Sequence, residues 1–196
     1  MAGYDIEVKL LAVTPESENL IEQAGRLCYD TDKIKSTTPG WIGKRISQGH
    51  ESIIEHGVAT FYIRCSRVVT HELVRHRLAS YSQRSQRYVN ESKSQYITPS
   101  ELTTLEQIQV YVLAMENAWE AYQLLLLSGI KPEIARYVLP NACETKIICT
   151  WNFREIRHII KLRTSPAALP EMREVAGYIR DIMVEKVPAV FEDLKI

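Results

Sequence analysis

The sequence concentrates arginine in one segment of an otherwise neutral chain. Residues 64–87 contain six arginines and a single acidic residue, Glu72, whereas the 196 residues together carry 24 basic and 24 acidic side chains. Arginine presents a planar fork of N–H donors that matches two oxygens of a phosphate or carboxylate at once. The segment therefore predicts an anion-binding site. A solvated basic face, or ion pairs between subunits, is the alternative interpretation.

Helical periodicity places two ionisable residues of this segment on an apolar surface. The pattern predicts a helix over residues 67–76, in which Glu72 and His76 share the arc of Val69 and Leu73. Buried ionisable groups are costly unless they are paired. The two residues are either a satisfied structural pair or the wall of a site, and the adjacent arginines favour the wall.

A second predicted helix begins after Asn152, a residue type that caps helix N-termini well. Arg163 falls on the apolar stripe of this helix, beside Ile156, and can either enter a site or extend from the helix end into solvent. Arg154 and His158, four residues apart, share another face and are spaced to hold a second ligand.

No metal site is predicted. His50 and His56 bracket two glutamates, but their spacing differs from HExxH, so ordinary hydrogen-bonding histidines are preferred over a zinc site. The chain also lacks the GxGxxG and GxxxxGK[ST] loops that hold nucleotides in common folds. Any nucleotide cofactor must therefore be bound in another way.

The elements that must position these residues indicate one α+β domain covering residues 1–196. We expect a mainly antiparallel sheet flanked by helices, because strands and helices mix without strict alternation. Residues 80–87 are polar without a clear period and are predicted as a loop. Strands are predicted at 8–13, 58–63 and 145–151, and helices after Thr14, at 41–46, near 101–128, at 133–139, from Asn152 and at 171–187.

Composition and segment lengths indicate a cytoplasmic protein that binds neither membranes nor nucleic acid. Hydrophobic residues make up 45% of the chain, but no run approaches the roughly 20 apolar residues that span a bilayer. The four cysteines form no CxxC pair and are predicted to be free thiols. The zero net charge argues against binding to bulk nucleic acid.

Ordered motifs identify a family resemblance. Arg75-His76-Arg77, seven residues and then Ser85 resemble the RHRx7S signature of the flavin-dependent thymidylate synthases. Six further stretches agree in order between about residues 49 and 163: GHES at 49–52, EH at 55–56, SQRY at 85–88, EIAR followed by VLP at 133–140, NFR at 152–154, and LR at 162–163.

The resemblance implies reductive methylation of deoxyuridylate (dUMP) to thymidylate. Methylenetetrahydrofolate would be the carbon donor, NADPH the reductant, and FAD the carrier of methylene and hydride. It places FAD among Ser52, Arg75, His76, Arg77, Gln83, Asn152, Phe153, Arg154 and His158. It places dUMP among Glu72, Arg75, Gln83, Arg84, Ser85, Gln86, Arg87, Arg136 and Arg163. Arg163 would be the catalytic residue, stabilising uracil ionised at N3.

The resemblance also implies a homotetramer whose sites are built at subunit junctions. Two positions depart from the family pattern, with Gln83 where many members have Glu and Ala167 where many have His. Two rival functions remain: a hydrolase-type site in which His76 activates Ser85 as a nucleophile, and a nucleic-acid patch over residues 64–87.

Overall fold

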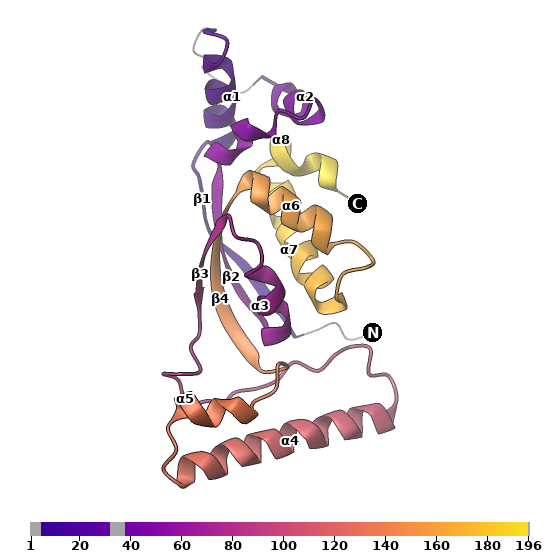
Figure 1. Ribbon diagram of the computed structural model, residues 1–196. Helices are drawn as coiled ribbons and strands as arrows, with labels where there is room; N and C mark the ends of the chain where they lie inside the picture. Colours follow the sequence, from indigo (N-terminus) through magenta and orange to yellow (C-terminus); the bar gives the residue numbers. More distant parts are fainter. Residues whose placement is uncertain (1–4, 32–37, 196) are drawn as a thin grey trace.

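A four-stranded antiparallel sheet forms the centre of the fold in this computed structural model, which describes residues 5–31 and 38–195 (Figure 1). The strand order is β1-β2-β4-β3, so the first and third strands in sequence lie at the edges. The mixed helix and sheet architecture with antiparallel pairing confirms the predicted α+β class. The strands are β1 (Glu7–Val13), β2 (Val58–Ser66), β3 (Ala79–Gln83) and β4 (Glu144–Asn152).

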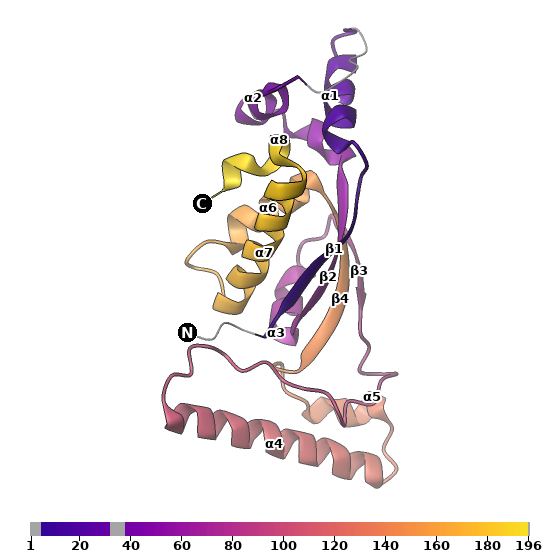
Figure 2. The ribbon, with the colours of Figure 1, turned by 180° about the vertical axis from the view of Figure 1, so that it is seen from behind.

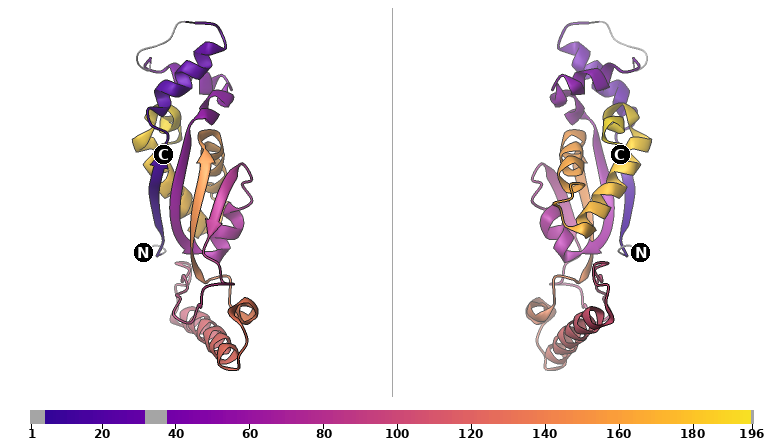
Figure 3. Two further views of the ribbon diagram at one scale, coloured as in Figure 1. Left: turned by 90° about the vertical axis from the view of Figure 1, so that its left-hand side faces the viewer. Right: turned by 90° about the vertical axis from the view of Figure 1, so that its right-hand side faces the viewer.

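One face of the sheet carries the core. Alternate residues of the two central strands are buried, including Phe61 and Ile63 of β2 and Ile147 and Trp151 of β4. The helices α3 (Arg67–Leu73), α6 (Phe153–Arg163) and α7 (Pro170–Lys186) cover this face. Figure 3 shows the opposite face of the sheet without a helical cover.

A small helical cap closes one end of the sheet. It consists of α1 (Ser17–Leu27), α2 (Trp41–Ser47) and the 3-10 helix η1 (Glu51–His56). The sequence predicts that the first helix packs on the sheet; instead α1 packs mainly against η1 and α2, beyond the strand ends (Figure 2). The cap places Ser52 and the histidines beside it near the start of α6.

A second helical unit lies across the other end of the sheet. It contains α4 (Leu105–Leu127), α5 (Pro132–Ala135) and the 3-10 helix η2 (Arg136–Val138). The long predicted helix is confirmed, and Thr104 and Gln107 form a capping box at its start. Its apolar side chains are buried only in part: Met115 and Tyr122 are buried, whereas Leu105 is 71% exposed. Among the described residues, no helix is both long and apolar enough to cross a membrane.

The α3 helix is shorter than predicted and is fixed at its N-terminus by a buried carboxylate. Ser66 caps α3 by accepting a hydrogen bond from the Val69 amide, and it donates through its own amide and hydroxyl to Glu171 at 2.8 and 2.6 Å. Burial raises the pKa of Glu171. The helix ends at Leu73 rather than His76, yet Glu72 and His76 still face the same neighbour.

The prediction of a loop over residues 80–87 is wrong for its first half. Residues 79–83 form the edge strand β3, paired with β4, in which only alternate side chains are partly buried. The Tyr81 hydroxyl donates a hydrogen bond shared by the Leu73 and His76 carbonyls, at 2.6 and 2.7 Å, and accepts one from Trp151 Nε1. Burial raises the pKa of Tyr81 to about 12, so the hydroxyl keeps its proton. These contacts fix the backbone beside the RHR segment.

The start of α6 is packed tightly against the sheet end. As predicted, Asn152 caps the helix, its side-chain oxygen accepting from the Glu155 amide at 2.8 Å. The Phe153 amide donates to the Gly57 carbonyl, and a Cβ at Gly57 would lie within 2.2 Å of the Phe153 ring. The chain then closes over α6 with two short helices absent from the prediction, α8 (Pro188–Phe191) and η3 (Glu192–Leu194).

Candidate functional site

Four buried or half-buried side chains form a continuous network between α3 and α6. His76 Nδ1 lies 2.9 Å from Glu155 Oε1, and His76 Nε2 lies 3.3 Å from Arg163 Nε. Arg163 Nη1 donates to Glu72 Oε2 at 2.7 Å. Burial lowers the pKa of His76, because the charged imidazolium loses solvation there. The structure thus joins the predicted residues Glu72, His76 and Arg163 with Glu155 into one cluster, called the His76 network below.

Helical periodicity left two alternatives open: where the Arg163 side chain points, and whether Glu72 and His76 pair with each other. The network decides both. Arg163 does not extend into solvent from the end of α6; it turns back to Glu72 and His76 and keeps only 19% of its side chain exposed. Glu72 and His76 do not pair with each other, because Arg163 lies between them. The side chains are therefore arranged as a site wall with one fixed guanidinium.

A cavity of about 430 Å³ opens beside the network. Arg154 and His158, the predicted pair on α6, both line it, and the His158 ring lies edge-on to His76 with centroids 5.5 Å apart. Its remaining lining residues are Glu51, Leu78, Glu155, Arg157 and Lys161. Three cations face two carboxylates there, so the cavity suits an anionic group such as a pyrophosphate.

Arg157 supplies a buried donor at this cavity. Its guanidinium is 1% exposed and holds Asp193 of η3 through two hydrogen bonds of 2.5 and 2.6 Å. Its Nε atom is buried without a hydrogen-bond partner among the described residues, and a Glu51 carboxylate oxygen lies 3.9 Å from it. Arg154 is exposed and pairs with Glu55 at 2.6 Å, so a ligand would compete for it with a surface carboxylate.

Three predicted flavin residues lie around this region in different settings. Ser52 lines a separate small pocket of about 100 Å³ together with His50 and Trp41. Asn152 uses its side chain to cap α6. Phe153 is fully buried against Phe191, so only its backbone can face a ligand.

Arg75 and Arg77 flank His76 and point away from the core. Both are exposed. Within residues 5–31 and 38–195, neither side chain has a hydrogen bond or ion pair. Their charges are therefore available to a ligand or to another chain.

The rest of the basic segment lies at the opposite end of β3. A five-residue strand at about 3.4 Å per residue separates His76 from residues 84–87 by more than 10 Å. Ser85 accepts from the Arg87 amide, and Arg87 pairs with Glu133 of α5 at 3.0 Å while 56% of its side chain remains exposed. Arg136 is exposed on η2. Residues 84–87 with Arg67 and Arg136 are called the open cluster below.

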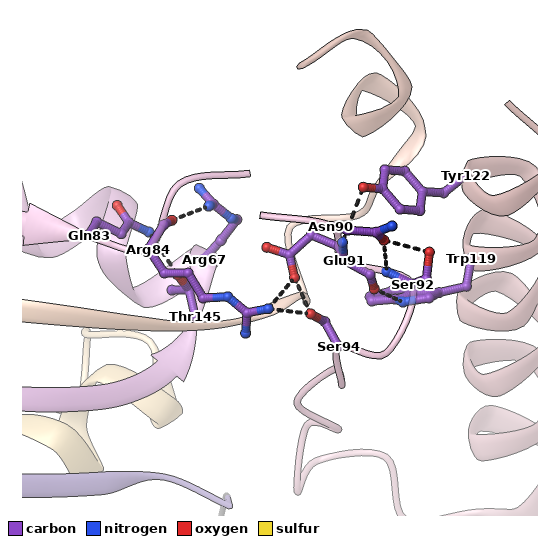
Figure 4. Close-up of polar contacts among 10 residues, drawn as sticks. All are labelled: Arg67, Gln83, Arg84, Asn90, Glu91, Ser92, Ser94, Trp119, Tyr122 and Thr145. Atoms are coloured by element: carbon purple, nitrogen blue, oxygen red, sulfur yellow. Dashed lines mark hydrogen bonds and ion pairs between the residues drawn. The ribbon is translucent and has the colours of Figure 1, made fainter. Parts of the chain in front are cut away.

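Figure 4 shows how the open cluster is anchored. Arg84 reaches from the end of β3 to Glu91 and Ser94, at 3.1 and 2.8 Å. The Glu91 backbone is held in turn by Tyr122 and Trp119 of α4. The long helix therefore positions the segment that carries Ser85 and Arg87.

Two buried donors in this region have no hydrogen-bond partner in the part of the chain that the structure describes. The Nε atom of Arg67 and the Nε2 atom of Gln86 are both buried without a hydrogen bond, while Arg67 Nη2 donates to the Arg84 carbonyl. Burial and the neighbouring charges of Arg136 and Arg84 lower the pKa of Arg67. An anion placed here would relieve that repulsion between like charges.

Gln83 lies between the two groups, at the end of β3. Its amide donates to Thr70 at 3.0 Å. It also donates to Thr145 at 3.3 Å, and Figure 4 draws both residues of this second contact. The amide is therefore occupied by hydroxyl groups of the protein rather than directed at either cluster alone.

The structure removes one rival function and one metal candidate. His76 and Ser85 lie at opposite ends of β3, so His76 cannot activate the Ser85 hydroxyl of the same chain. His50 and His56 do not gather with the neighbouring glutamates into a ligand set. In the part of the chain that the structure describes, the one group with metal-ligand spacing is His76, Glu155 and His158. Both nitrogens of His76 are already engaged there, and Arg163 lies against the ring.

Sequence reasoning missed Glu155 and Tyr81. Asn152 and Glu155 have the three-residue spacing of a capping box, which gives Glu155 an ordinary helix-start role. Its carboxylate points instead to a histidine 79 residues away. For Tyr81, the weak alternation of residues 79–83 was the available signal.

The fold and the two clusters define an α+β protein whose basic sites suit anionic ligands. The family model described as "Thymidylate synthase complementing protein" matches residues 9–189, and the chain belongs to this family. Three relatives are named flavin-dependent thymidylate synthase. The Geobacter sulfurreducens protein is 38% identical, with 96% of this chain and 86% of the relative covered. The Clostridium tetani protein is 37% identical (95% and 86%), and the Mycobacterium avium protein 38% (90% and 79%).

Proposed function

We propose that the protein is a flavin-dependent thymidylate synthase that methylates dUMP with methylenetetrahydrofolate as carbon donor and NADPH as reductant. The observation that carries the proposal is the match over nearly the whole chain to proteins of that name. The distribution of arginines supports it, since each end of β3 offers cations to an anionic ligand.

FAD fits the region around the His76 network. The cavity beside it is lined by Arg154, Arg157 and Lys161, and the buried Nε of Arg157 lacks a partner, which suits a pyrophosphate. When bound, FAD supplies methylene and hydride transfer. We assign its contacts to Ser52, Arg75, His76, Arg77, Gln83, Asn152, the Phe153 backbone, Arg154 and His158.

The nucleotide would contact both groups of basic residues, one group supplied by each of two chains. In the open cluster, Arg84, Ser85, Gln86, Arg87 and Arg136 offer donors to its phosphate. At the His76 network, Glu72 and Arg163 would receive the uracil, together with Arg75 and Gln83. The fixed guanidinium of Arg163 is suited to stabilise negative charge on the ring edge as N3 ionises.

A homotetramer with sites at subunit junctions accounts for this division. Within one chain, the proposed dUMP residues form two groups at opposite ends of β3, more than about 10 Å apart. A second chain can bring its open cluster to the His76 network of the first. Exposed apolar residues of α4 and α5 support an interface there: Leu105, Val110, Leu113, Leu124, Leu127 and Ile134.

The direct test incubates the purified protein with FAD, NADPH, methylenetetrahydrofolate and dUMP. We expect thymidylate and NADP⁺ to form in equal amounts, and no thymidylate to form when NADPH is omitted or when FAD is removed from the protein. Formation of dihydrofolate with thymidylate in the absence of NADPH would contradict the proposal, because the folate would then be the reductant.

A further inference from the structure

We propose that Glu155 is a positioning residue that holds His76 as the neutral tautomer protonated on Nδ1, and through it orients Arg163. The structural part of this inference stands on the contacts alone. Its catalytic consequence rests on the proposed function, in which Arg163 stabilises the ionised uracil.

The contacts on the two sides of the imidazole specify the same tautomer. A carboxylate accepts hydrogen bonds, so Glu155 at 2.9 Å requires a proton on Nδ1. Arginine has no acceptor and does not lose its proton in proteins, so Arg163 Nε at 3.3 Å requires a lone pair on Nε2. A doubly protonated ring would place N–H against N–H at Arg163.

Burial restricts the imidazole to this tautomer. The side chains of His76 and Glu155 are 4% and 10% exposed, so water offers little alternative hydrogen bonding. The titratable or charged groups that face the ring are Glu155, His158 and Arg163 from α6, with Glu72 from α3 behind Arg163. Loss of solvation lowers the pKa of His76, which agrees with a neutral ring.

As a consequence, hydrogen bonds hold the Arg163 guanidinium at two of its edges. His76 accepts from Nε of Arg163, and Glu72 accepts from Nη1 at 2.7 Å. Arg163 is the last residue of α6 and would otherwise sample many rotamers. Preorganised donors stabilise developing charge best because they need not reorient during the reaction. Glu155 would thus affect the reaction without touching a substrate.

The test compares Glu155→Gln with wild type by magic-angle-spinning ¹⁵N NMR of histidine-labelled, full-length protein. The Gln amide can donate as well as accept, so it removes the preference for a proton on Nδ1. Disappearance of one signal pair in His76→Asn assigns the His76 nitrogens. We expect the Nδ1–H tautomer in wild type, and a mixture or the Nε2–H tautomer in Glu155→Gln. The control Glu185→Gln removes an exposed carboxylate that pairs with Lys186 and should leave the signals unchanged.

Kinetics supply the second readout. Outer partners that orient functional histidines typically contribute 10- to 100-fold, as metal sites show. We expect Glu155→Gln to lower kcat for thymidylate formation by about that factor and to change the KM for dUMP by less. A Glu155→Asp variant keeps a carboxylate and should retain the wild-type tautomer.

Two results would overturn the inference: a cationic or Nε2–H His76 in wild type at neutral pH, or an unchanged His76 spectrum in Glu155→Gln. The wild-type spectrum decides the first even if the variant does not fold. Because the tautomer is measured without turnover, absence of thymidylate synthesis would defeat the proposed function alone. Conversely, an active enzyme with the wrong tautomer would defeat only this inference.

Discussion

The two ends of β3 present arginines in opposite environments. At the His76 network, Arg163 is largely buried and held by Glu72 and His76. In the open cluster, Arg87 is mostly exposed and Arg136 has no ion-pair partner among the residues that the structure describes. The first arrangement is preorganised for one geometry, whereas the second has charge but few internal restraints. A reacting group needs a preorganised arrangement such as the His76 network. An incoming phosphate or a second subunit can supply the restraints that the open cluster lacks.

The strongest challenge to this comparison is Arg163→Lys. Lysine keeps the charge but cannot donate from one rigid plane to Glu72 and His76 together. We expect single-turnover thymidylate formation to fall by roughly 100- to 1000-fold, while NADPH still reduces the bound flavin. Arg180→Lys changes an arginine that is 18% exposed and pairs with Asp181 outside both clusters, and it should behave like wild type. A rate near wild type in Arg163→Lys would mean that charge alone suffices at this end.

The open cluster is tested by Arg87→Ala. We expect the affinity for dUMP, measured by calorimetric titration, to fall by about 10- to 150-fold, the effect of losing a charged hydrogen bond. FAD affinity should change less. The matched variant Glu133→Gln releases Arg87 from its carboxylate partner and should leave nucleotide affinity equal or slightly tighter. Equal losses of FAD and dUMP binding in Arg87→Ala would contradict the assignment of the open cluster to dUMP rather than to FAD.

Smaller effects are expected from Arg154→Ala and His158→Ala. Each removes one exposed donor at the cavity beside the network. We expect flavin affinity to weaken by about 2- to 10-fold for each, visible as paler protein after dialysis. Full flavin content in both variants would show that this face of α6 is not a flavin site.

The smallest expected effect is a pH dependence of stability from His76. Its pKa is lowered from 6.5 on folding, so the unfolded chain takes up a proton before the folded one does. Stability from this residue is therefore complete above about pH 6.5 and is lost as the pH falls below it. Urea unfolding at pH 7.5 and 5.5 should show a steeper loss for wild type than for His76→Asn. Parallel losses would place the imidazole in a solvated setting.

Local patterns in the sequence predicted most of the elements. Capping chemistry predicted the helix that begins after Asn152, and periodicity predicted the long helix near residues 101–128, which begins at Leu105 in the structure. Patterning also predicted most of the strand residues of β1, β2 and β4. The strand β3 was not predicted, because its edge position leaves only alternate residues half-buried. The helix end at Leu73 escaped because the apolar arc continues through His76.

The sequence by itself determined the family resemblance, the set of basic residues and the helix faces on which they lie. Only the tertiary structure decided which of those charges are held and by which partners. Arg64 is neutralised by Asp5 and Glu144, and Arg163 by Glu72, 91 residues away. The physical reason is that helix and strand periods act over a few residues, whereas hydrogen bonds between ionised groups form wherever the fold brings them within about 3 Å. The carboxylates that neutralise some of these arginines therefore could not be predicted from spacing along the chain.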